Sequence, residues 1–115
     1  MSHPGDAAEA AALATAAVAL SLGKSLTVAT AESLTAGMVA ASLANTPGAS
    51  GMLQGGVVAY QNSVKASVLG VSTELLDAVG SVDGAVAEAM AEGARRGLHG
   101  RRRNIHHRRG RSGAP

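Results

Sequence analysis

The sequence predicts an α/β fold in which closely packed helices cover a largely parallel or mixed sheet. Short apolar runs typical of strands alternate with helix-forming segments, which is the order found in layered α/β proteins. Apolar residues make up 46% of the 115 residues, and the sequence contains no Phe or Trp. A core of mainly Ala, Val and Leu suits helices packed closely on a sheet. A chain of this length forms at most one domain.

Local start and stop signals predict the individual elements. Asp6 is suited to begin the first helix and Gly23 to end it. Ser72 is suited to begin a later helix, and a period near 3.6 joins Val86 to Met90 in the last one. We therefore expect, in chain order, a helix over 6–22, a strand over 25–30, a turn over 31–37, a helix over 38–43, a strand over 55–60, and helices over 62–69, 72–79 and 82–98.

The charge is divided sharply along the chain. The formal net charge is +2, but residues 1–100 hold four basic and eight acidic residues, which gives −4. Residues 101–115 hold six arginines and no acid. This composition predicts a domain over 1–99 and a basic, disordered tail over 100–115. Arginines attract phosphate, but no stacking aromatic or recognition motif accompanies them, so nucleic-acid binding is the less favoured interpretation.

Several classes of site are excluded or disfavoured. The absence of cysteine excludes disulfides and thiolate zinc sites, and it fits a cytoplasmic protein. The adjacent His106 and His107 lack the spacing of metal ligands, so we expect no metal and no cofactor. The alanine-rich stretch 7–22 has no basic region before it and is flanked by Asp6, so we interpret it as a helix of a water-soluble domain, without a membrane span or signal peptide.

Two segments contain candidate functional residues. The first is Ala-Glu-Ser-Leu-Thr-Ala-Gly over 31–37, where a strand passes into a helix and free backbone N–H groups can hold an anion. Its alternative interpretation is ordinary helix capping by Ser33 or Thr35. The second contains Ser50, Tyr60 and Lys65, in which the serine is suited to act as a nucleophile and the lysine as its base. Their alternative interpretations are a turn serine, a structural tyrosine and a surface lysine.

The ordered motifs resemble the CinA C-terminal domain family, the nicotinamide-nucleotide amidases, from about residue 10 to residue 98. The family's Ala-Glu-Ser-Cys-Thr-Gly-Gly corresponds to residues 31–37, with Leu34 and Ala36 as departures. Its Pro-Gly-Ser-Ser corresponds to residues 47–50, its Gly-Gly-Val strand with Tyr-Ser-Asn to residues 55–62, and its Lys with Leu-Gly-Val to Lys65 and residues 69–71. The resemblance implies a three-layer α/β/α domain, incomplete at its C-terminal part.

The resemblance also implies an activity and a set of site residues. Family members hydrolyse the carboxamide of nicotinamide mononucleotide (NMN) to nicotinic acid mononucleotide and ammonia. Position by position, Ser50 corresponds to the nucleophile, Lys65 to the base and Tyr60 to the relay. The implied substrate-binding residues are Glu32, Ser33, Thr35, Gly48 and Asn62. The implied partner is a pyridine nucleotide, and a folded chain is expected to form a homo-oligomer.

The chain departs from the family after residue 99, where the family continues with a strand and a Thr-Gly-Ile-Ala-Gly-Pro loop. Residues 100–115 can be encoded so that the frame one base later reads Ala-Asp-Val-Gly-Ile-Ser-Thr-Thr-Gly-Val-Ala-Gly-Pro-Glu-Pro. We hypothesise a frameshift near Gly100, which the nucleotide sequence can test. Three functions therefore stay open: an amidase, a truncated non-catalytic fragment, and a nucleic-acid binder that uses the tail.

Overall fold

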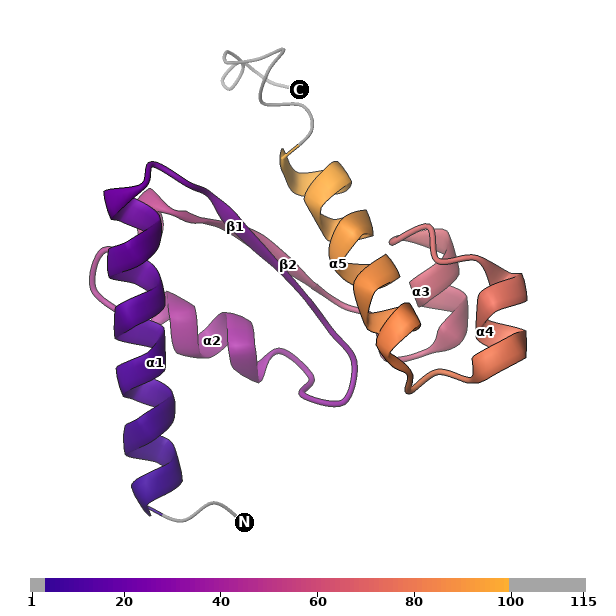
Figure 1. Ribbon diagram of the computed structural model, residues 1–115, viewed down its shortest axis with the longest axis horizontal. Coiled ribbons are helices and arrows are strands. Elements are labelled where there is room, and N and C mark those ends of the chain that lie inside the picture. The colour runs from indigo at the N-terminus through magenta and orange to yellow at the C-terminus, as the bar shows by residue number, and fades with distance from the viewer. Residues whose placement is uncertain (1–3, 100–115) are drawn as a thin grey trace.

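The computed structural model describes residues 4–99, and it has the α/β architecture that the sequence predicts (Figure 1). The elements, in chain order, are α1 (Pro4–Gly23), β1 (Val28–Glu32), α2 (Met38–Ala44), the 3₁₀ turn η1 (Ala49–Gly51), β2 (Leu53–Val58), α3 (Asn62–Ser67), α4 (Thr73–Val79) and α5 (Gly84–His99). The predicted tail over 100–115 lies outside the described residues, as do His106 and His107.

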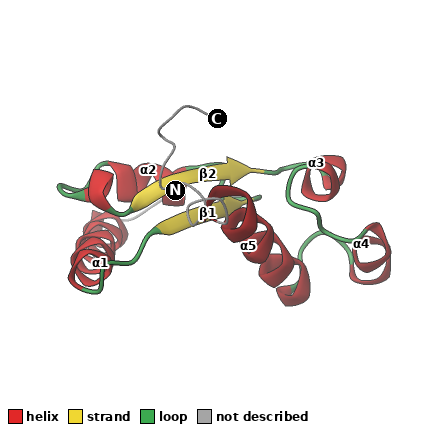
Figure 2. Ribbon diagram, turned by 90° about the horizontal axis from the view of Figure 1, so that it is seen from above, coloured by secondary structure: helices red, strands yellow, loops and turns green. Residues whose placement is uncertain are grey.

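The described sheet consists of β1 and β2, which run parallel and are joined through α2. The register pairs Val28 with Leu53 and Glu32 with Val58, with an irregularity after Val28. Figure 2 shows α1 and α2 toward one end of the strands and α3 and α4 beyond the other end. Parallel strands need helical cover on both faces, and α2 and α5 supply it.

Two apolar clusters hold the layers together. On one face, Val86, Met90 and Ala94 of α5 are buried together with residues that follow β2, and Ala29, Ala31 and Val57 of the strands pack against them. On the other face, residues of α1 and α2 join Met52 and are packed against Val28 and Leu53; the buried members are Ala14, Val18, Leu43, Ala49 and Met52. The strands therefore form the middle of three layers.

Both strands are displaced from the ranges predicted from the sequence. The first begins at Val28 rather than at residue 25, because α1 ends in a left-handed turn at Ser25, whose φ is 56°. The amide of Leu26 bonds the carbonyl of Ser21 at 2.8 Å across this turn. The second strand covers Leu53–Val58 rather than 55–60, because Gln61 already accepts the first bonds of α3 from Val64 and Lys65.

The helix starts also differ in detail from the prediction. Helix α1 begins at Pro4, so Asp6 lies inside its first turn, and proline is well suited to that position. The predicted cap of α4 is confirmed, because the Ser72 hydroxyl accepts from the amide of Leu75 at 3.2 Å. Helix α5 begins at Gly84 rather than at residue 82, because the Asp83 carboxylate accepts from the amide of Ala85 at 2.8 Å. Among residues 4–99, no helix is both long and apolar enough to cross a bilayer.

Candidate active site at the carboxyl ends of the strands

Most of the predicted site residues lie at one end of the sheet. Ser33 and Thr35 follow β1 directly, while Tyr60, Asn62 and Lys65 follow β2. Because the strands are parallel, both sets follow the carboxyl ends of the strands and lie at the same end of the sheet. The amide of Ala59 bonds the carbonyl of Glu32 at 2.8 Å, so the two chains are still side by side where they leave the strands.

The Glu32 side chain fixes the turn after β1. Its carboxylate is buried and accepts the Thr35 hydroxyl at 2.6 Å. It also accepts three backbone amides at the start of α2, from Gly37 at 3.2 Å and from Val39 and Ala40 at 2.9 Å each. Burial alone would raise the pKa of Glu32, but these hydrogen bonds outweigh it and hold the pKa below its ordinary value. The carboxylate therefore caps α2 and fixes the turn that follows β1.

This arrangement replaces the predicted capping by Ser33 or Thr35. The residue at the N-cap of α2 is Gly37, which has a φ of 99° and makes no side-chain cap. Ala36 before it is also left-handed, with a φ of 52°. The first turn of α2 is therefore satisfied by a carboxylate from the end of β1, and Thr35 donates to that carboxylate instead of accepting from the helix. The Ser33 hydroxyl is not needed as a cap.

Lys65 is a buried residue, not the surface lysine of the alternative interpretation. It is fully buried in α3, and its Nζ donates to the carbonyl oxygen of Tyr60 at 2.9 Å. Tyr60 itself is 60% exposed, so its ring is not part of the core. The chain thus folds back on itself over five residues and holds the lysine against the backbone at the end of β2.

Ser50 and Gly48 lie at the opposite end of the sheet. Ser50 is exposed in η1, before β2 begins, whereas Lys65 follows the end of β2. Six residues of strand separate the two ends, which corresponds to about 16 Å. Gly48 packs toward α1, since a Cβ there would lie 3.2 Å from a methyl carbon of Leu22. The structure therefore does not bring Ser50 to Lys65, and the expected pairing of these two residues is not formed within the chain.

A cavity of about 550 Å³ lies beside the turn after β1. One wall is the segment 31–35, which contains Ser33, and the other is the start of α5 with Ser81 and Asp83. Ser81 and Asp83 are not among the site residues expected from the sequence, although a serine and an aspartate just before a helix are a recognisable pattern. In the part of the chain that the structure describes, no three potential metal ligands come together.

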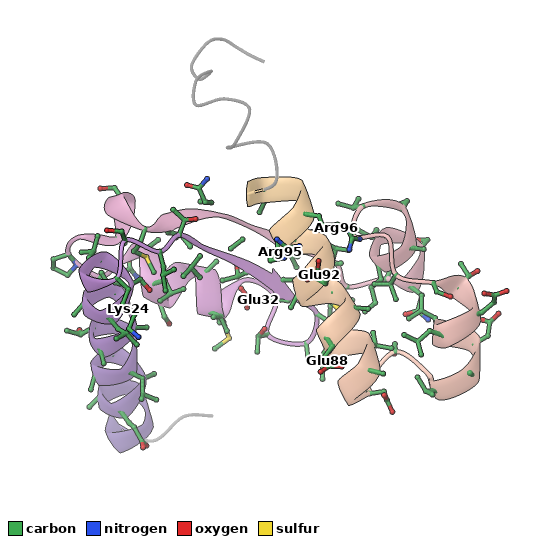
Figure 3. All side chains as sticks on the ribbon, turned by 45° about the horizontal axis from the view of Figure 1, so that its top comes forward. Lys24, Glu32, Glu88, Glu92, Arg95 and Arg96 are labelled. Atoms are coloured by element: carbon green, nitrogen blue, oxygen red, sulfur yellow. The ribbon has the colours of Figure 1, made fainter. Side chains whose placement is uncertain are left out.

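Figure 3 shows how the charged side chains lie around this edge. Glu32 lies at the end of β1, where its carboxylate bonds the start of α2, while Glu92, Arg95 and Arg96 lie along α5. Glu92 pairs with Arg95 at 2.6 Å and with Arg96 at 3.6 Å, and all three side chains are largely exposed. These ion pairs stabilise the helix surface weakly and do not line the cavity.

Comparisons with known proteins identify relatives of this fold and sequence. A "CinA-like protein" from Mycolicibacterium paratuberculosis is 56% identical over 68 residues, which are 59% of this chain and 16% of that protein. The crystal structure of the competence/damage inducible protein CihA from Agrobacterium tumefaciens is 37% identical, with a TM-score of 0.76. That match covers 86% of this chain and 59% of that one.

A second solved structure agrees with the first. A CinA superfamily protein from Escherichia coli is 29% identical, with a TM-score of 0.73, and the match covers 75% of this chain and 50% of that chain. The chain thus spans only part of the length of each relative. Residues 10–101 match the sequence profile described as the CinA C-terminal domain, which is most of the sequence. With its fold and its motifs in agreement, the chain belongs to the CinA C-terminal domain family.

Proposed function

We propose that this chain contains the nucleophile and the base of an amidohydrolase site that acts on the carboxamide of NMN. The observation that supports the proposal most directly is the common position of Ser33 and the buried Lys65 at the carboxyl ends of two parallel strands. In open α/β sheets, ligands bind outside this edge. The cavity beside Ser33 offers the space for a substrate there.

The geometry favours Ser33 over Ser50 as the nucleophile. Ser33 lines the cavity and leaves the sheet beside the segment that carries Tyr60 and Lys65. Ser50 is at the other end of β2. A serine can be activated only by a base within hydrogen-bond reach, so a residue about a strand length away cannot serve Lys65. Ser33 therefore takes the catalytic role that the motif comparison assigned to Ser50.

The proposed reaction has two steps. The Ser33 hydroxyl oxygen attacks the carboxamide carbon while the Lys65 side-chain nitrogen accepts its proton, and collapse of the tetrahedral intermediate expels ammonia, which takes that proton. Water then attacks the acyl-serine, again giving its proton to Lys65, and releases the carboxylic acid and free Ser33. Serine–lysine sites use a lysine as the base, and Lys65 is fully buried in α3. Glu32 holds the turn that positions Ser33.

The test is NMN-dependent ammonia release by the purified full chain, followed with a coupled glutamate dehydrogenase assay and by chromatography of the nucleotide product. We expect Ser33→Ala to lower the rate by at least about a thousandfold, because it removes the nucleophile. Ser50→Ala is the matched control and should stay within about twofold of the parent.

Two results would overturn parts of this proposal. Loss of turnover in Ser50→Ala with retention in Ser33→Ala would overturn the nucleophile assignment. If a chain with a cooperative melting transition released no more ammonia than its Ser33→Ala variant, the amidase proposal would be wrong. The chain would then be a non-catalytic member of the family.

A further inference from the structure

We propose that helix α1 pairs with α1 of a second copy of this chain, in an antiparallel arrangement about a twofold axis. The proposal concerns an interaction surface and does not depend on amidase activity. It gives the homo-oligomer expected from the family resemblance a specific contact. Three observations support it: the exposed apolar side of α1, the charges at the two ends of that side, and the symmetry of the pattern they form.

Helix α1 is apolar on nearly all of its sides. Over residues 7–23 its polar side chains are those of Glu9, Thr15 and Ser21. A helix that is apolar all round is normally enclosed by protein. Over the same residues, however, the buried side chains form a single row, which consists of Ala14, Val18 and Ser21. Figures 1 and 2 show the reason, because α1 lies at one end of the molecule with α2 as its neighbour.

A separate side of α1 carries an exposed apolar row. Leu13 and Leu20 are 65% and 60% exposed, and the exposed Ala16 and Ala17 lie between them. Spacings of three, four and seven residues place these side chains on one face of an α-helix. Apolar residues grouped on one face indicate a protein contact, whereas single scattered ones do not. The small alanines at the centre of the row allow a second helix to approach closely.

A charge of opposite sign lies at each end of this row. Glu9 lies one turn before Leu13, and Lys24 lies one turn after Leu20. The amide of Lys24 donates to the carbonyl of Leu20 at 3.1 Å, so the helical path continues as far as Lys24. Both charged side chains are exposed, and Figure 3 shows Lys24 beside α1. Among residues 4–99, neither of them forms an ion pair.

The row is its own complement under a twofold rotation. Three pairs of positions are centred on the same point of the helix, midway between residues 16 and 17: Ala16 with Ala17, Leu13 with Leu20, and Glu9 with Lys24. Two antiparallel copies of α1 therefore bring Leu13 of each copy opposite Leu20 of the other. The same rotation brings Glu9 of each copy to Lys24 of the other, which forms two ion pairs. A twofold dimer requires a self-complementary patch of this kind.

The charges favour a second copy over a lipid surface as the occupant. Helices that lie on membranes combine an apolar face with several Lys or Arg residues on their polar side. The row on α1 has one lysine at one end and a glutamate at the other. Residues 1–100 hold four basic and eight acidic residues, a net charge of −4, which an anionic bilayer repels. A second copy offers charges of both signs in matching places.

The contact is small, so we expect a weak dimer. From Glu9 to Lys24 the row is about 22 Å long. Two helices that touch over this length bury less surface than a standard interface, and we expect a Kd on the order of 100 µM. Equilibrium sedimentation of the full chain from about 10 µM to about 2 mM covers this range. A chain that is folded by circular dichroism and stays monomeric throughout would overturn the proposal.

Exchange of the two charges tests the antiparallel arrangement. Glu9→Lys places lysines opposite each other at both ends of the row, and Lys24→Glu places glutamates there. Each should weaken the dimer about tenfold, because two attractive pairs become repulsive. The double variant Glu9→Lys/Lys24→Glu restores both pairs and should dimerise within about twofold of the parent. If all three variants dimerised like the parent, the two charges would not meet and the proposal would be wrong.

A leucine substitution tests the apolar part of the row. Leu13→Gln should weaken the dimer at least about tenfold, because each dimer loses two apolar contacts. Leu34→Gln is the matched control, since Leu34 is 67% exposed but lies in the turn after β1. It should leave the Kd within about twofold of the parent value. Equal weakening by the two substitutions would show association without a defined surface and would overturn the proposal.

Cross-linking measures the register, since the chain has no cysteine of its own. Leu13→Cys and Leu20→Cys chains, one of them labelled with nitrogen-15, are mixed and mildly oxidised. We expect disulfides that join the two variants, identified by mass spectrometry. In Leu13→Cys alone, the two thiols are offset by about 10 Å along the helices, beyond the reach of a disulfide. Faster cross-linking of Leu13→Cys with itself than with Leu20→Cys would contradict the antiparallel register.

Deletion of residues 101–115 tests whether the terminal segment takes part. We expect the shortened chain to dimerise with a Kd within about twofold of the parent value. If the deletion abolished the dimer, residues 101–115 rather than α1 would join the copies. If only the shortened chain dimerised, the terminal segment would cover the row in the full chain. Either result would overturn the proposal.

Discussion

The backbone of Gly93 in α5 lies directly against the carbonyl group of Leu69, just after α3. No side chain fits between them, because a Cβ at position 93 would overlap the carbonyl oxygen of Leu69. This contact lets α5 approach the segment after α3 closely, and both Val86 and Met90 then reach the apolar cluster beside it. The absence of a side chain at Gly93 therefore allows the close spacing between α5 and the segment after α3, the helix that contains Lys65.

We expect Gly93→Ala to destabilise the chain by about 3 kcal/mol, because backbone cannot move aside as a side chain can. Gly97→Ala, four residues along the same helix, has no heavy atom within 4 Å and is the matched control. It should stabilise α5 by about 0.5–1 kcal/mol, since alanine is the better helix former. Urea denaturation followed by circular dichroism measures both. Equal effects of the two substitutions would contradict the contact.

The buried Thr30 hydroxyl and Gly56 should be energetically coupled. Among residues 4–99 the hydroxyl has no hydrogen-bond partner, and it occupies the place where a Cβ at Gly56 would lie. We expect Gly56→Ala to cost about 1–3 kcal/mol in the parent, as overpacking does. In a Thr30→Ala background, most of that cost should disappear. A double-mutant cycle of unfolding free energies measures the coupling. Additive costs would show that the two residues do not meet.

Ala36 lies in the left-handed region, with a φ of 52°, where glycine is unstrained. Ala36→Gly should therefore stabilise the chain by up to about 1 kcal/mol. Ala41→Gly, in the middle of α2 and exposed, should instead cost about 1 kcal/mol. Thermal melts of the two variants compare them directly. If glycine destabilised both positions equally, the left-handed turn before α2 would be incorrect.

Glu32 should make stability depend on pH in a defined direction. Its pKa is lowered in the folded chain, so its contribution is complete above the ordinary value of 4.5 and is lost as pH falls below it through the folded-state pKa. We expect Glu32→Gln to cost about 2–3 kcal/mol at pH 7, since the bonds it loses are charge-assisted.

The dependence of unfolding free energy on pH distinguishes capping by the charged Glu32 carboxylate from a contribution of its packing alone. Glu32→Gln should lose less stability than the parent as pH falls below 4.5, because it no longer has the group that titrates. Glu88→Gln, on the exposed surface of α5 (Figure 3), is the control and should keep the profile of the parent. Denaturant titrations at several pH values give the comparison. Parallel profiles for the parent and Glu32→Gln would show that the carboxylate does not cap α2.

The sequence alone determined the order and nature of the elements, because each depends on neighbours along the chain. The β-branched and apolar runs placed both strands to within three residues, and the Ser72 cap was placed correctly. The segment 31–37 was a candidate site because of its place between a strand and a helix. Family membership also followed from the sequence, because ordered motifs are a property of the chain itself.

Only the tertiary structure decided which of these residues share an end of the sheet. Along the sequence, Ser50 is closer than Ser33 to Tyr60 and Lys65. In the fold, however, β2 separates Ser50 from them, and the parallel pairing of β1 with β2 brings Ser33 to their end of the sheet. Likewise, the burial of Lys65 and the capping role of Glu32 depend on chain segments that meet only after folding. Strand pairing is a contact between distant segments, so the local patterns favoured a parallel or mixed sheet but could not specify which strands pair or in what register.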